Sequence, residues 1–229
     1  MVSVKTDGKH FAVARFKLGE YNSILVYEIG LSDALPYLKD GFRRASKLLA
    51  ARGDFVVFVT SSDSKFVKER MGGTTGATLN GYNMAVRINK GSKTWKTTVG
   101  RSIAHEYCHI VRFQAMGSRM TNLAEDICTE GLAQCFEEKI IGERSQWSQA
   151  ISEKKAGEVW NQIKDRLALQ NHDLYKKLFT DGEEKEFPLW AGYTVSYQII
   201  RKGLADFGKF DWNETIRKDP IALIGKGLS

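Results

Sequence analysis

The sequence has few cysteines and no long apolar run, and each shortage excludes a class of protein. No apolar stretch approaches the ~20 residues that a helix needs to cross a bilayer, so we expect no membrane span. The start of the chain lacks the apolar segment of a signal peptide. The three cysteines, Cys108, Cys128 and Cys135, lack the spacing of a disulfide framework and are interpreted as small buried hydrophobes. These features favour a reducing compartment, the cytoplasm, over secretion after removal of a leader.

Acidic residues are scarce between residues 61 and 101. This stretch carries eight basic residues against only Asp63 and Glu69. The basic residues are Lys65, Lys68, Arg70, Arg87, Lys90, Lys93, Lys96 and Arg101. A basic stretch is typical of a surface that binds nucleic acid or an acidic substrate, but most often it is a solvated face. Single-strand binders interleave aromatic side chains, and here Trp95 is the main one, so nucleic acid is not the expected partner.

The first hundred residues read as a mixed segment of strands and helix. Residues 10–16 and 23–29 have strand-like patterns separated by a short polar turn, which predicts a hairpin. A helix follows from Ser32 or Asp33, and residues 55–59 and 84–89 predict two further strands. Gly72, Gly73 and Gly76 predict a mobile loop. It lacks the G-K-[ST] run of a phosphate-binding loop.

The strongest pattern in the chain is His105-Glu106-Tyr107-Cys108-His109, which reads H-E-x-x-H. On a helix, positions i and i+4 share a face, so His105 and His109 can present two imidazole nitrogens to one Zn²⁺. Glu106 is suited to be the general base for a water beside the metal. The alternative is a pair of surface histidines, but the surrounding residues are apolar and predict a mostly buried helix.

A hydrolytic zinc site needs a third protein ligand, and Glu130 is the candidate. It lies in a second predicted helix, residues 121–139, which Thr121 or Asn122 can cap. Gly131 and Ala133 are small, so they allow another helix to approach closely. The alternative is that Glu130 is a solvated helix glutamate. Together with the histidine pair, its residue type favours one Zn²⁺ bound by three side chains.

These motifs resemble those of the gluzincin metallopeptidases. The chain more closely resembles a bacterial and archaeal family of unknown function described as predicted Zn-dependent proteases. The resemblance covers about residues 54–203 and is carried by the H-E-Y-x-H run, an E-G-L-A-x-x-F-E run from Glu130, and a W-x-G-Y run from Trp190. It implies that His105, His109 and Glu130 are zinc ligands and that Glu106 is the catalytic base.

The resemblance also has consequences outside the ligands. It implies that the strand before the motif helix lies at the sheet edge and binds extended substrate, which would place Ala85, Val86 and Arg87 at the substrate; an ordinary edge strand is the alternative. Thermolysin-like enzymes have an Asp where this chain has Gln134, so Glu125 and Asp126 are both candidates for the outer partner of the zinc histidines.

Two further features concern the reaction. The amine-binding G-A-M-E-N run of zinc aminopeptidases is missing, which favours an endopeptidase. An oxyanion formed during hydrolysis needs a donor, for which Tyr193 is the first candidate and Tyr197 the second. The alternative is that both tyrosines only pack on the buried face of a helix, and the sequence supports this interpretation equally well.

We therefore expect an α+β, zincin-like fold in a single domain over residues 1–229. A sheet lobe would span about residues 1–100, and the active-site helix and helical lobe about residues 101–229. The expected activity is zinc-dependent hydrolysis of peptides or proteins. Two alternatives are a protease that acts on nucleic-acid-associated proteins and a catalytically silent sensor or binding module.

Overall fold

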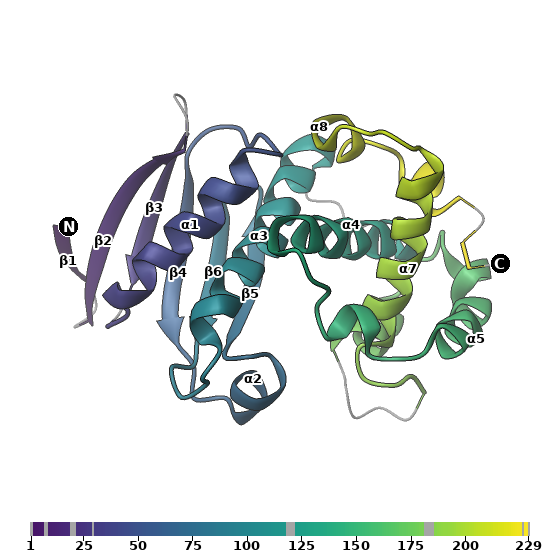
Figure 1. Ribbon diagram of the computed structural model, residues 1–229, viewed down its shortest axis with the longest axis horizontal. Helices are drawn as coiled ribbons and strands as arrows, with labels where there is room; N and C mark the ends of the chain where they lie inside the picture. Colours follow the sequence, from purple (N-terminus) through teal and green to yellow (C-terminus); the bar gives the residue numbers. More distant parts are fainter. Residues whose placement is uncertain are drawn as a thin grey trace. The chain divides into compact units, whose positions relative to one another are not determined.

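The protein was analysed as a computed structural model that describes residues 2–6, 9–18, 22–28, 30–117, 122–180, 186–225 and 227–228. The chain divides into two compact units, Met1–Ser118 and Arg119–Ser229, of which the first contains the sheet (Figure 1). The H-E-x-x-H helix belongs to this first unit, so the division lies after that helix and not near residue 100. A single domain over residues 1–229 stays a prediction.

The first unit contains a six-stranded mixed sheet in the order β1-β2-β3-β4-β6-β5. The strands are β1 Val2–Thr6, β2 Lys9–Leu18, β3 Asn22–Glu28, β4 Phe55–Ser61, β5 Thr74–Asn80 and β6 Asn83–Ile88. Antiparallel pairing of β2 with β3 confirms the predicted hairpin. β4 lies parallel to both β3 and β6, and β5 is antiparallel to β6.

The predicted edge strand is wrong, because β6 lies inside the sheet. Ala85 pairs with Phe58 of β4 on one side and with Ala77 of β5 on the other. Val86 and Arg87 are also paired on both sides, so the backbone of β6 is hydrogen-bonded to β4 and β5 and cannot pair with a substrate. The strand at the end of the sheet is β5, which contains Gly76 and lies where a mobile loop was predicted.

Helices cover one face of this sheet, where α1 and α3 lie side by side (Figure 1). The helical elements of the unit are η1 Ser32–Ala34, α1 Leu35–Ser46, α2 Lys65–Arg70 and α3 Trp95–Met116. Aromatic rings of Phe42, Phe55 and Tyr107 meet with centroids 5.7 to 6.2 Å apart and join α1, β4 and α3. The hydroxyl of Tyr107 donates to the Leu49 carbonyl at 2.9 Å and accepts from the Ala51 amide at 3.2 Å. The tyrosine within the H-E-Y-x-H run therefore anchors the helix.

In the second unit, all the regular secondary structure of the described residues is helical. Its elements are α4 Leu123–Ile141, η2 Trp147–Gln149, α5 Glu153–Ile163, η3 Lys164–Arg166, α6 His172–Tyr175, the π-helical turn η4 Lys176–Thr180, α7 Ala191–Asp206, α8 Trp212–Thr215 and α9 Pro220–Ile224. The side chain of Asn122 accepts from the Glu125 amide at 3.0 Å, which confirms Asn122 as a cap of α4. Thr121, the other predicted cap, lies outside the described residues. Gly142 ends the helix in a left-handed conformation.

Glycine allows α4 and α7 to approach each other closely. A Cβ atom on Gly131 would lie 2.4 Å from both Ile200 Cγ1 and the Ser196 carbonyl oxygen, closer than any side chain tolerates. The small residue beside Glu130 thus serves the α4–α7 contact. A sheet covered on one face in one unit, with helices in the other, confirms the predicted α+β class. No helix in the described part of the chain is long and apolar enough to cross a membrane.

Candidate metal centre

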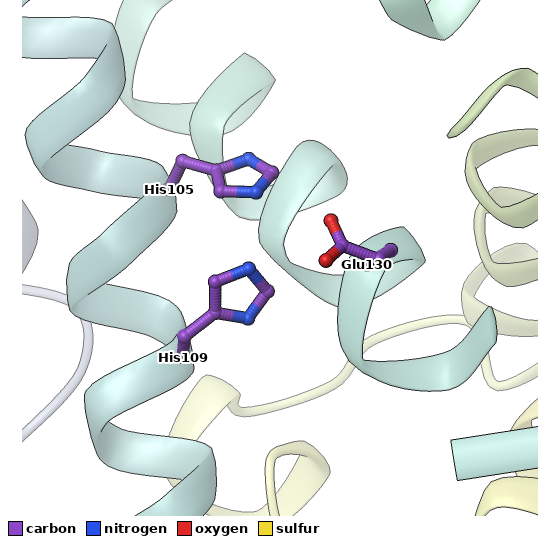
Figure 2. Close-up of side chains that lie close together, drawn as sticks. All are labelled: His105, His109 and Glu130. Atoms are coloured by element: carbon purple, nitrogen blue, oxygen red, sulfur yellow. The ribbon is translucent and has the colours of Figure 1, made fainter. Parts of the chain in front are cut away.

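The two histidines of the motif project from the same side of α3, as their spacing predicts (Figure 2). Their ring centroids lie 4.7 Å apart with the planes at 84°. His105 is half-buried and His109 is 6% exposed. Val99, Ile103 and Ile110 are fully buried around them, which confirms the prediction that this helix is mostly inside the protein.

Glu130 completes a group that can hold a metal ion. One potential ligand atom from each of His105, His109 and Glu130 lies within 4.8 Å of the others. Figure 2 shows the carboxylate of Glu130 turned toward the two imidazole rings. Among the described residues, this is the group of three or more His, Cys, Asp or Glu side chains whose ligand atoms meet.

The chemistry of this group fits zinc. Two imidazoles with one carboxylate form a ligand set of catalytic zinc sites, which keep a fourth position for water or substrate. The carboxylate is 5% exposed and arises from the middle of α4, so the protein holds it in place instead of leaving it in solvent. The cysteines are not part of the group. All three are buried free thiols, which agrees with the prediction that they are small buried hydrophobes. Burial also raises the pKa of the Cys135 thiol.

Glu106 lies on another side of α3, against β5. Its side chain is 7% exposed. The hydroxyl of Thr78 donates to Glu106 Oε2 at 2.7 Å and also lies 3.0 Å from the Glu106 carbonyl oxygen. A Cβ atom on Gly76 would lie 2.3 Å from Glu106 Cγ, so the glycine makes room for the carboxylate. The first unit therefore holds the carboxylate beside its edge strand.

Comparison with known protein families agrees with this geometry. The model of a family described as "Predicted Zn-dependent protease (DUF2268)" matches residues 37–224, most of the chain. The chain belongs to this family. The resemblance found in the sequence is thereby confirmed at the level of the family. No curated protein matches the chain.

The region that matches the family model contains Glu125 and Asp126, the two candidates for an outer partner of His105 and His109. Glu125 and Asp126 are both nearly buried at the start of α4. Glu125 Oε1 accepts a hydrogen bond from Thr129 of its own helix at 3.2 Å. Burial, followed by the negative charges of Glu130 and Glu125, raises the pKa of Asp126 to about 7. Their role toward the histidines stays a prediction.

The structure separates the two tyrosines that were candidates for the oxyanion donor. Tyr197 is 1% exposed, and its hydroxyl donates to Glu138 Oε2 at 2.6 Å. Glu138 lies eight residues beyond Glu130, roughly 12 Å further along α4. The Tyr197 hydroxyl is therefore engaged well away from Glu130.

Tyr193 is connected to Glu130 through Gln134. The amide nitrogen of Gln134 lies 2.9 Å from the carbonyl oxygen of Tyr193 and 3.2 Å from that of Glu130. Its amide oxygen accepts from Ser148 at 2.9 Å. The neutral amide of Gln134 therefore joins the turns of α4 and α7 that carry Glu130 and Tyr193.

The W-x-G-Y run has a physical explanation in the start of α7. The backbone φ angle of Trp190 is 62°, and among the described residues it is the one positive φ angle outside glycine. A Cβ atom on Gly192 would lie 2.7 Å from the Leu178 carbonyl oxygen. The run therefore shapes the first turn of the helix that carries Tyr193.

The basic residues expected beside a substrate are placed differently. Arg87 is exposed on β6, whereas its neighbours Val86 and Ile88 are buried beneath the helices, so Arg87 points to the opposite face of the sheet. Lys90 binds Asp33 at 2.5 Å. The residues that do face Glu106 are Gly76 and Thr78, which the sequence reading missed. A glycine within a strand marks a close approach of another group, but the sequence predicted a loop at Gly76, so this signal could not be recognised.

Proposed function

We propose that this protein hydrolyses peptide bonds with one Zn²⁺ held by His105, His109 and Glu130 and with Glu106 as the general base. The observation that carries this proposal is the meeting of two imidazoles and one carboxylate within 4.8 Å. Support comes from the family, whose description is that of Zn-dependent proteases. An intact glutamate at position 106 favours catalysis over a silent binding module, because a site that only binds metal has no need of a base.

Zinc, when bound, supplies a Lewis acid that polarises a carbonyl and lowers the pKa of a coordinated water toward ~7. Glu106 accepts the proton of the attacking water and passes it to the leaving amine. Its carboxylate is suited to this task because β5 and α3 enclose it, leaving 7% of the residue exposed. A proton acceptor fixed in a largely dry site loses little to reorganisation during the reaction.

Tyr193 is the proposed donor to the oxyanion. It is half-buried, and Gln134 joins its turn of α7 to the turn of α4 that carries Glu130. Tyr197 is the weaker candidate because its hydroxyl already donates to Glu138. A hydroxyl at the developing negative charge stabilises the transition state more than the bound substrate.

The proposed substrate is an extended peptide within a longer chain. β5 ends the sheet and carries Gly76 and Thr78 beside Glu106. An added strand at a sheet edge binds through its backbone and needs no free terminus, which supports an endopeptidase. This replaces β6 as the proposed substrate strand.

The proposal is tested with the purified protein, a metal analysis and a digest of a broad peptide library. We expect one equivalent of zinc and cleavage at internal bonds. Glu106→Gln should keep the zinc and the fold but lose nearly all hydrolysis, because an amide cannot take the proton. Hydrolysis at the parent rate in Glu106→Gln would remove Glu106 as the base. Absence of zinc would refute the proposed site.

A further inference from the structure

Among the residues that the structure describes, the hydroxyl of Thr78 makes a side-chain hydrogen bond to the carboxylate of Glu106. The distance from Thr78 Oγ1 to Glu106 Oε2 is 2.7 Å, typical of a hydroxyl that donates to a charged oxygen. The same hydroxyl lies 3.0 Å from the Glu106 carbonyl oxygen. A hydroxyl has one hydrogen, so the shorter, charge-assisted bond to the carboxylate is the stronger of the two.

The contact fixes both the position and the rotation of the carboxylate. Gly76 provides the space, since its missing Cβ would lie 2.8 Å from Glu106 Cδ and 2.7 Å from Oε1. Thr78 then holds Oε2 from two residues further along the same face of β5. One oxygen is thus engaged by the protein, and the carboxylate cannot rotate without breaking a charge-assisted bond.

The strand that carries Thr78 is itself tied to α3. Thr98 of α3 donates to the Gly72 carbonyl at 2.8 Å, and Ser102 of α3 bonds Thr74 of β5 at 2.9 Å. Thr98, Ser102 and Glu106 follow one another at intervals of four residues, roughly 6 Å along a helix. Gly72, Thr74 and Gly76, which lie against these three helix residues in turn, are two residues apart, roughly 6.6 Å in a strand, so the two elements stay in register. Thr78 lies two residues further along β5 and is reached by the long side chain of Glu106. Thr78 therefore acts on Glu106 from a fixed support.

We propose that Thr78 is a positioning residue for Glu106, holding the carboxylate in the orientation in which it takes a proton. This rests on the proposed function of Glu106 as the base. The hydroxyl of Thr78 touches neither the ligand group nor, in this proposal, the substrate. Its loss should therefore lower the rate of the chemical step and leave zinc binding and substrate binding as they are.

Three variants separate positioning from packing. Thr78→Val removes the hydroxyl and keeps the shape, Thr78→Ser restores a hydroxyl, and Thr74→Val removes a neighbouring hydroxyl that joins β5 to α3 without touching Glu106. On a peptide that the parent cleaves, Thr78→Val should lose about tenfold to a hundredfold in kcat with KM nearly unchanged. Thr78→Ser should recover most of that loss. Thr74→Val, in which the bond from Thr98 to the Gly72 carbonyl still joins the strand to α3, should lose much less kcat than Thr78→Val. Equal losses in Thr74→Val and Thr78→Val would overturn the proposal, since packing alone would then explain both.

A second measurement reports on the contact without any hydrolysis. In protein with ¹³C-labelled glutamate carboxyl groups, the Glu106 resonance is the one that Glu106→Gln removes. We expect this resonance to move in Thr78→Val, to stay near its parent position in Thr78→Ser, and to move less in Thr74→Val than in Thr78→Val. If the Glu106 resonance does not move in Thr78→Val, the hydrogen bond between Thr78 and Glu106 is refuted. A parent protein without Glu106-dependent hydrolysis would instead refute the proposed function, and the resonance would still decide whether Thr78 holds the carboxylate.

Discussion

Substitution of Gly76 by alanine tests how tightly the site holds Glu106. The added methyl group would lie 2.3 Å from Glu106 Cγ, whereas ordinary contacts begin at 3.4 Å, so the glutamate must retreat by about 1 Å. A misplacement of that size at a reacting group costs about 10²-fold in rate. The backbone of Gly76 has no positive φ, so alanine brings no backbone strain.

We expect Gly76→Ala to fold, to bind zinc as the parent does, and to lose about a hundredfold in kcat. The assay combines kinetics on a cleaved peptide with metal content and thermal unfolding. Gly157→Ala is the matched control, because a Cβ atom at Gly157 of α5 meets nothing within 4 Å. That control should keep the parent rate and gain about 1 kcal/mol of stability in its helix. A Gly76→Ala protein with the parent kcat would show that the position of Glu106 against β5 does not limit the reaction.

Three other predictions concern the tyrosines and one buried acid. Tyr193→Phe should lower kcat by about 10²–10³ with little change in KM, whereas Tyr197→Phe should lower the melting temperature and leave kcat nearly intact; the reverse ranking would exclude Tyr193 as the donor. Tyr107→Phe removes both hydrogen bonds of a buried hydroxyl and should cost about 1–3 kcal/mol in urea unfolding, and an unchanged midpoint would contradict its anchoring role. The pKa of Asp126, about 7 in the folded protein against 3.8, means that folding retains a proton that the unfolded chain releases. The stability of the metal-free protein should therefore fall as pH rises from about 4 to 7, by at most about 1.4 kcal/mol per pH unit, and Asp126→Asn should show a weaker fall.

The parts of the fold that follow local rules could be predicted from the sequence. Helical spacing of apolar residues around His105 and His109 indicated a buried helix, and the structure has α3 there. The capping chemistry of Asn122 located the start of α4. These features depend on neighbours within a few residues, which is the range that a sequence pattern reports.

The order of strands could not be predicted in this way. β5 reads T-T-G-A-T-L-N, with a glycine and few large apolar side chains, so its sequence resembles a loop. It is a strand because its backbone pairs with β6 and its Thr74 and Thr78 bond to α3, 28 residues later in each case. Such long-range contacts override local propensity, and they decided which strand lies at the edge. The same holds for Tyr197, whose partner Glu138 lies 59 residues away.

The proposed zinc site is best tested by measuring the zinc affinity of variants at Glu130. The measurement is a competition titration of the metal-free protein with a chromophoric chelator, for the parent, Glu130→Gln and Glu137→Gln. Glu137 is the control because it is also buried on α4 but lies outside the group of potential ligands. We expect one zinc site in the parent and a loss of more than about 100-fold in zinc affinity for Glu130→Gln, which exceeds the loss expected for an outer partner of a ligand. We expect parent affinity for Glu137→Gln, and parent affinity in Glu130→Gln would contradict the His105, His109 and Glu130 site.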